Sequence, residues 1–88
     1  MITKQITIKG NTTRHILQKS LRQKAEELEI TGTMKVDKNH SITLVATGDK
    51  NNLEHFITWC EAASMEHGVA VTETRNIGFK AFYNFSLT

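Results

Sequence analysis

The segment from Gly10 to Gly32 constrains the fold more than any other part of the chain. Gly10 ends a run in which isoleucines alternate with polar residues, so a strand with one buried face is expected from Ile2 to Lys9. Four apolar residues then recur at steps of four, four and three, the spacing of one stripe on an amphipathic helix. They are Leu17, Leu21, Ala25 and Leu28. Thr31-Gly32 opens another strand, so the segment predicts strand, turn, helix and strand in succession.

Two further alternations predict a hairpin after this helix. Apolar and polar residues alternate at 33–36 and again at 42–46, the period of strands with one buried face. Between them, Asp37-Lys38-Asn39 has the side chains that favour tight turns. The two strands are therefore expected to be antiparallel neighbours.

The C-terminal half predicts a second helix and two more strands. After Gly48-Asp49, four apolar residues at i, i+3, i+4 and i+7 mark the buried side of a helix that ends near Gly68. They are Leu53, Phe56, Ile57 and Cys60. A threonine-rich strand is expected to begin at Val69, and a last strand is expected where the odd-numbered positions are all apolar or aromatic. These positions are Phe79, Ala81, Tyr83, Phe85 and Leu87.

The order of elements is β-α-β-β-α-β with an extra C-terminal strand. This order predicts an α+β fold, a ferredoxin-like α/β sandwich in which two helices pack on one face of a mostly antiparallel sheet. The chain has 88 residues, no proline and no internal repeat, so a single domain over residues 1–88 is expected. A core of that size has no room for a deep cofactor cavity, and no cofactor is expected.

Composition and charge exclude several classes of protein. Hydrophobic residues at 39% and charged residues at 23% fit an ordinary globular domain. No segment approaches the ~20 apolar residues of a membrane span, and the N-terminus lacks a signal-peptide-like apolar run. The net charge of +2 is too small to argue for a nucleic-acid partner. Lys19, Arg22 and Lys24 lie among the glutamates of the first helix, as on a solvated face.

Cysteine and histidine usage points away from disulfides and metals. Cys60 is the only cysteine, which excludes an intrachain disulfide and suits a reducing compartment, so a cytoplasmic protein is expected. His55 and Cys60 lie about 140° apart around the second helix and cannot share a metal ion. No metal site is expected, and Cys60 is interpreted as a small core residue. Trp59, one position off the apolar stripe, is expected to pack at the edge of the core.

The Gly10–Gly32 segment resembles the active-site frame of the acylphosphatase family. In that family the turn reads Gly-x-Val-Gln-Gly-Val-Gly-Phe-Arg, the helix ends in Ala-x-x-Leu-Gly-Leu-Thr-Gly, and the next strand supplies an asparagine. Counting from Ala25 and Leu28 places Gly10 on the first family glycine. The same count places Gln18 at the arginine and Val36 at the asparagine.

The resemblance covers nearly the whole chain. The stretch 41–48, SITLVATG, resembles the family strand Ser-Val-Glu-Val-Val-Ala-x-Gly. The second helix matches Leu-x-x-Phe-x-x-Trp to within one place, and residues 83–87 resemble the closing Phe-x-Phe-x-Ile strand. Because most of these matches are core and turn positions, the resemblance implies the acylphosphatase-like sandwich before it implies an activity.

What the resemblance implies about activity conflicts with the residues present. Acylphosphatases hydrolyse the carboxyl-phosphate anhydride without a metal: backbone N–H groups of the turn hold the phosphate, the arginine clamps it, and the asparagine orients the attacking water. Here both inner glycines of the turn are lost, and β-branched Ile16 is badly suited to a positive φ. Gln18 donates only neutral hydrogen bonds, and Val36 has no polar atom.

The leading expectation is therefore a catalytically degenerate acylphosphatase-like domain with a residual anion-binding or protein-interaction role. A small phosphate or acyl phosphate is the expected ligand. The candidate ligand-binding residues are Asn11, Thr12, Thr13, Arg14, His15 and Gln18. The alternative is an active acylphosphatase in which Arg14, helped by His15, takes the place of the absent arginine.

A third alternative is an RNA-binding module, because the same sandwich serves that function in other proteins. Such modules stack bases on aromatic side chains of the open sheet face. The face opposite the helices is expected to carry threonines, lysines and Phe82 alone among aromatics. The sequence thus shows no stacking platform, and the threonine-rich face is interpreted as exposed to solvent.

Overall fold

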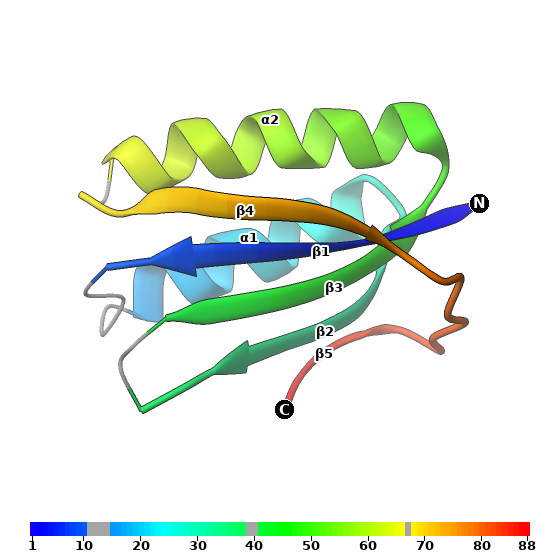
Figure 1. Cartoon of the computed structure of the whole chain (residues 1–88), viewed down its shortest axis with the longest axis horizontal. Coiled ribbons are helices and arrows are strands. Elements are labelled where there is room, and N and C mark those ends of the chain that lie inside the picture. The colour runs from blue at the N-terminus through cyan, green and yellow to red at the C-terminus, as the bar shows by residue number, and fades with distance from the viewer. Residues whose placement is uncertain (11–14, 39–40, 67) are drawn as a thin grey trace.

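The computed structural model describes residues 1–10, 15–38, 41–66 and 68–88, with only the backbone at 15 and 16 (Figure 1). Its elements follow the predicted order. They are β1 (Ile2–Lys9), α1 (His15–Glu27), β2 (Thr31–Val36), β3 (Ile42–Gly48), α2 (Lys50–Glu66), β4 (Ala70–Ile77) and β5 (Phe85–Leu87).

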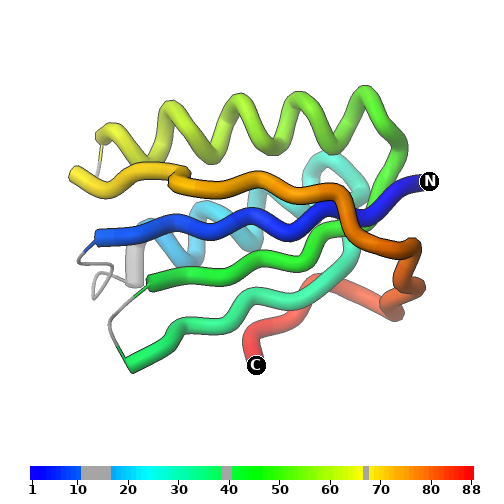
Figure 2. Tube along the Cα trace, viewed as in Figure 1, coloured from blue at the N-terminus to red at the C-terminus, as the bar shows by residue number. Residues whose placement is uncertain are grey.

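The five strands form one sheet in the order β4-β1-β3-β2-β5. The pairs β1–β3, β1–β4 and β2–β3 are antiparallel, and only β2–β5 is parallel. Both helices lie on the same side of the sheet, with α2 running along the β4 edge (Figures 1 and 2). This arrangement confirms the predicted ferredoxin-like α+β sandwich.

The prediction of a long last strand is wrong, because residues 78–84 leave the sheet. β4 and β5 are on opposite edges, so the chain between them must pass across the ends of β1 and β3. It is held there by the main chain of Lys80, whose N–H donates to Thr3 Oγ1 at 2.9 Å and whose carbonyl accepts from Thr47 Oγ1 at 2.8 Å. Phe79 and Tyr83, expected to alternate in a strand, are 61% and 100% exposed.

This crossing also corrects the interpretation of the threonine-rich face. Thr3 and Thr47 are register partners on neighbouring strands, and their hydroxyl oxygens are 2.7 Å apart. Their exposed fractions are 1% and 2%, so this end of the face is buried under the Lys80 main chain. Further along the same face Thr7 and Thr43 are partly exposed. The threonines therefore divide between a buried hydrogen-bonded pair and a half-exposed sheet surface.

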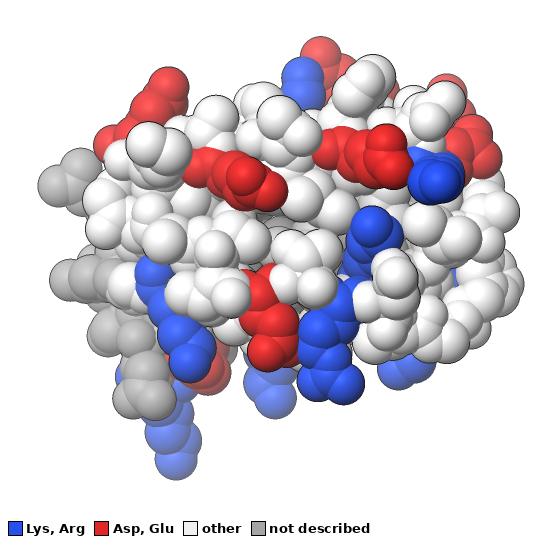
Figure 3. Space-filling view, turned by 45° about the horizontal axis from the view of Figure 1, so that its top comes forward, with Lys and Arg blue, Asp and Glu red and all other residues white. Residues whose placement is uncertain are grey.

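On the face seen in Figure 3, charged side chains of both signs are interspersed with uncharged ones, and carboxylates lie along α2. Among the described residues, no helix is long and apolar enough to cross a membrane.

The C-terminus of α1 is closed by a Schellman-type pair of hydrogen bonds. Ile30 N–H donates to the Ala25 carbonyl at 2.8 Å, and Glu29 N–H donates to the Glu26 carbonyl at 3.1 Å. Glu29 has a φ of 57°, the left-handed conformation that glycine adopts without steric cost. Ile30, only 2% exposed, inserts into the core and anchors the motif.

β2 approaches β3 too closely at Gly32 for any side chain. Gly32 has a φ of 148°, and a Cβ atom built there would lie 1.7 Å from the Val45 carbonyl oxygen. Its N–H donates to the Asn84 carbonyl at 2.9 Å, which ties β2 to the chain entering β5. Gly32 is therefore a structural requirement of the central sheet.

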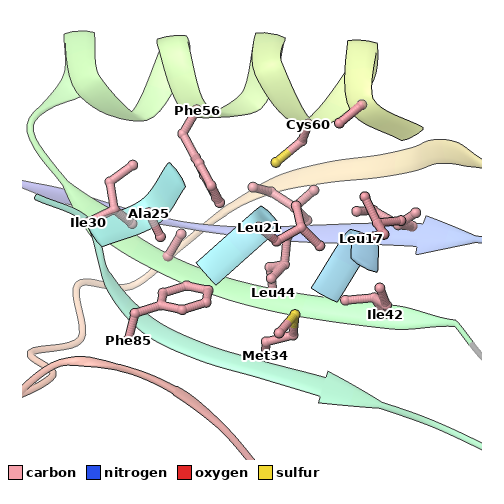
Figure 4. Close-up of a cluster of buried hydrophobic side chains, with 14 of the residues drawn as sticks. Leu17, Leu21, Ala25, Ile30, Met34, Ile42, Leu44, Phe56, Cys60 and Phe85 are labelled. Carbon is pink, nitrogen blue, oxygen red and sulfur yellow. The ribbon is translucent and has the colours of Figure 1, made fainter. Parts of the chain in front are cut away.

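The core lies between the helices and the sheet (Figure 4). It contains the predicted stripe of α1 through Leu17, Leu21 and Ala25, and it contains Phe56 and Cys60 from α2. Phe56 meets Phe85 of β5 edge to face at a ring-centroid distance of 6.4 Å. Cys60 is fully buried and Trp59 packs against the edge of the cluster, so both predictions for these residues are confirmed.

Candidate functional site

The predicted site is at the end of the sandwich where β1 ends, α1 begins and β2 ends. The structure describes Gly10, the backbone of α1 from His15 onward, Gln18 and Val36. Four of the candidate ligand-binding residues, at positions 11–14, lie outside the described residues, as does the side chain of His15. The anion nest in this turn and the role of Arg14 thus stay predictions.

Gly10 has a packing reason to be glycine. Its φ is 136°, and a Cβ atom built there would lie 2.5 Å from Val69 Cγ1. The end of β1 therefore packs directly on the start of the chain entering β4. Gly10, which the sequence count aligns with the first glycine of the family's turn, is therefore needed for packing against Val69.

Ile16 belongs to α1, which begins one residue earlier at His15. The helical conformation has a negative φ, which β-branched residues tolerate. The concern that Ile16 is unsuited to a positive φ therefore does not arise in this structure. The family's second inner glycine is replaced here by a residue of the first helical turn.

Gln18 lines a shallow hollow of about 230 Å³ between α1 and the β2–β5 edge. The side chain of Gln18 is half-buried. The other lining residues are Lys19 and Arg22 from α1, Met34 from β2 and Leu87 from β5. The Gln18 hollow thus has an apolar floor and a rim of one amide and two cations.

The cations of the Gln18 hollow extend outward into solvent. Arg22 Nε is 3.3 Å from a Glu26 carboxylate oxygen, with the two side chains 57% and 59% exposed. Such an exposed i,i+4 pair is worth a few tenths of a kcal/mol, so it holds the guanidinium only weakly. Lys19 is exposed. The hollow can attract a small anion, but it offers no rigid bidentate clamp.

Val36 is the last residue of β2 and packs partly buried against the core. The next residue, Asp37, accepts a hydrogen bond from Ser41 N–H on its Oδ1 at 3.0 Å, and its own N–H donates to the Ser41 carbonyl at 3.0 Å. The aspartate therefore closes the hairpin turn. The end of β2 thus has an aliphatic side chain at the position that the sequence count aligns with the family's asparagine.

Outside the predicted site, Cys60 is a buried titratable side chain. Burial raises the pKa of Cys60 to about 12, with a smaller contribution from the neighbouring Glu61 charge. A buried neutral thiol is not a nucleophile at ordinary pH. Among the described residues, no three His, Cys, Asp or Glu side chains gather as metal ligands would.

The sheet order, the short parallel fifth strand and the two helices on one face define an acylphosphatase-type sandwich. The acylphosphatase family model matches residues 4–85. The chain belongs to the acylphosphatase family.

Solved structures agree with this fold. An acylphosphatase from Coxiella burnetii aligns with a TM-score of 0.80 at 24% identity, over 99% of this chain and 92% of that one. The acylphosphatase from Bacillus subtilis aligns with a TM-score of 0.82 at 18% identity, over 100% and 99%. Full-length HypF, in a phosphate- and nucleotide-bound form, aligns at 0.75 and 16% identity over 99% of this chain but 12% of its own. No curated protein matches the chain.

Lys19 and Arg22 were predicted only to lie on a solvated helix face. The structure places both beside Gln18 in the same hollow. Gln18 and Arg22 are spaced i,i+4, and Lys19 and Arg22 are spaced i,i+3, a helical spacing that could have grouped the three residues. The contribution of Leu87 depends on the parallel register Met34↔Leu87, which helix and strand periodicity does not encode.

Proposed function

We propose that this chain is an acylphosphatase-family domain that has lost hydrolase activity and retains weak binding of a small phosphate or acyl phosphate near the start of α1. The observation that carries the proposal is the pair Gln18 and Val36. One contributes a neutral amide to a shallow hollow and the other an aliphatic group packed on the core. Neither can perform the step that the family assigns to its position.

The size of the expected loss supports a degenerate site. Removing one preorganised donor from an active site typically reduces turnover by ~100–1,000-fold. Here a charge-assisted clamp and a water-orienting amide are both absent, which amounts to several kcal/mol of transition-state stabilisation even when the losses are not additive. An enzyme with that deficit would lose most of its useful rate on acyl phosphates.

Residual anion binding is supported by electrostatics near the start of α1. The first turn of the helix contains no acidic residue, so its N-terminal dipole and N–H groups favour an anion. Lys19 and Arg22 add positive charge at the Gln18 hollow. The same features bind substrate phosphate and inorganic phosphate alike, so binding does not require turnover.

The hydrolysis of acetyl phosphate by the purified full chain tests the loss of activity. We expect the rate to equal that of buffer and to be unchanged in Arg14→Ala. A rate well above buffer that disappears in Arg14→Ala would instead establish an active acylphosphatase that uses Arg14.

A titration with inorganic phosphate, followed by backbone amide shifts in NMR, tests the binding separately. We expect saturable shifts at Gln18 and Lys19, weakened in Lys19→Gln and unchanged in Lys50→Gln. Lys50 is a suitable control because it is an exposed lysine at the start of α2. Shifts that sodium chloride reproduces at equal ionic strength would contradict a phosphate site.

A further inference from the structure

A second hollow lies in the valley between the two helices and shares no lining residue with the Gln18 hollow. Its volume is about 390 Å³, within the ~300–1,000 Å³ typical of small-molecule sites. Leu28, Trp59 and Ala62 give it an apolar surface, and Lys24, His55 and Thr58 are its polar lining residues. We refer to it as the Trp59 groove.

Trp59 gives this groove a flat aromatic surface. Its ring is nearly parallel to that of Phe56, at a centroid distance of 6.5 Å and an interplanar angle of 10°. Phe56 is fully buried, so this contact ties the indole to the core. Trp59 itself is only partly buried. A preordered aromatic surface of this kind binds another ring by offset stacking at little cost in conformational entropy.

The charges of the Trp59 groove differ from those of the helix that forms one wall. α2 contains Glu54, Glu61 and Glu66, and Lys50 is its one Lys or Arg residue. None of these carboxylates lines the groove, whose polar lining has a lysine, a histidine and a hydroxyl. The groove therefore presents hydrogen-bond donors beside the largely acidic surface of α2, and the Lys24 ammonium from α1 is the positive charge of its described lining.

Lys24 is positioned to serve an anion in the groove. Its side chain is 28% exposed, so most of the methylene stem is covered. Its Nζ atom is 3.6 Å from a carboxylate oxygen of Glu27, whose side chain is 68% exposed. Because an exposed ion pair of this length is weak, a ligand carboxylate can compete for the ammonium.

We propose that the Trp59 groove binds a small aromatic carboxylate, with its ring against the Trp59 indole and its carboxylate facing Lys24 and His55. Stacking on Trp59 favours an aromatic ring in the ligand. The Lys24 ammonium favours a carboxylate on that ring, and no acid in the described lining repels it. This site is independent of the acyl phosphate chemistry and does not rest on the proposed function.

Trp59 is the only tryptophan of the chain, so its fluorescence reports directly on the groove. We use 4-nitrobenzoate as the probe and the uncharged 4-nitrobenzamide as its matched control, with free N-acetyltryptophanamide correcting for absorption. Saturable quenching by 4-nitrobenzoate is expected, at least about fivefold tighter than with the amide, because the amide lacks the charge-assisted contact.

Single substitutions test whether the probe binds in the Trp59 groove. Lys24→Gln is expected to weaken 4-nitrobenzoate binding about fivefold and to remove its preference over the amide, whereas Lys50→Gln leaves both unchanged. In Trp59→Phe, the Ala62 methyl shift in NMR replaces fluorescence, and weaker binding is expected. Quenching that rises linearly without saturation, equal affinity for the two probes, or shifts confined to Gln18 and Lys19 would each overturn the proposal.

Discussion

The two ends of α1 differ in how much of the acylphosphatase pattern they keep. At the C-terminal end, Ala25 and Ile30 close the helix through main-chain hydrogen bonds, and Gly32 lets β2 approach β3. At the N-terminal end, counting from Ala25 predicts Gln18 and Val36 at the family's arginine and asparagine positions. The comparison teaches that the residues that build the sandwich and those that perform the chemistry are separate sets.

The C-terminal end of α1 also differs from the family's sequence pattern at one residue that shapes the fold. Glu29 stands where the family has glycine and keeps the left-handed φ of 57°. The hydrogen bonds around it and the buried Ile30 hold that conformation against a strain of roughly 1 kcal/mol.

The largest effect is expected at Gly32. In Gly32→Ala the new methyl group would overlap the Val45 carbonyl, so β2 and β3 must separate. We expect a loss of at least about 3 kcal/mol in the free energy of unfolding, measured by urea denaturation, or no folding at all. Thr33→Ala, one residue on, is the control and should cost about 1 kcal/mol or less. Equal effects would contradict the close approach.

Thr47→Val tests the buried threonine pair at the same end of the sandwich. The change removes the donor to the Lys80 carbonyl and the partner of the Thr3 hydroxyl while keeping the shape of the side chain. The expected cost is about 1–2 kcal/mol in thermal unfolding, because the buried Thr3 hydroxyl and the part-buried Lys80 carbonyl each lose a partner. Thr43→Val, on the same strand and partly exposed, should change stability by less than about 0.5 kcal/mol.

Glu29→Gly should stabilise the protein by about 1 kcal/mol, because glycine adopts the left-handed conformation without steric penalty. The matched control is Glu27→Gly, two residues earlier at the last residue of α1, which should destabilise by up to about 1 kcal/mol. If the two variants change the free energy of unfolding in opposite directions in chemical denaturation, the helix ends between these two residues. Destabilisation by both variants would show that Glu29 makes contacts outweighing its strain.

Near the N-terminal end of α1, Gln18→Arg should change the free energy of unfolding by no more than about 0.5 kcal/mol. Gln18 is half-buried at the rim of a shallow hollow, where a longer side chain can extend into solvent. Phosphate affinity should rise at the same time, since an arginine adds a charge-assisted clamp. A large loss of stability would mean that Gln18 belongs to the scaffold.

Much of the fold was predictable because the apolar spacing is regular where the chain packs on the core. The stripe through Leu17, Leu21 and Ala25 and the paired strands of the hairpin are local patterns that the structure confirms. The alternation from Phe79 to Leu87 is just as regular, yet only Phe85–Leu87 forms a strand. Residues 78–84 must connect opposite edges of the sheet, and that requirement depends on strand order.

The candidate site was predictable only in part, for the same reason. Counting along the helix placed Gln18 and Val36 at family positions, and the structure describes both. The Gln18 hollow depends on Leu87, which reaches Met34 through a parallel pairing between distant segments. The Trp59 groove likewise depends on the packing of two helices that are separated in sequence by the hairpin.

The double variant Gln18→Arg with Val36→Asn tests most directly the claim that the scaffold is kept and the chemistry is lost. Its acetyl phosphate hydrolysis should be measured beside that of the unchanged chain and of Gln18→Arg with Val36→Ala, which removes the valine without adding a polar group. We predict a rate at least ~100-fold above the unchanged chain for the double variant alone. An unchanged chain that already hydrolyses acetyl phosphate as fast as the double variant would contradict the account.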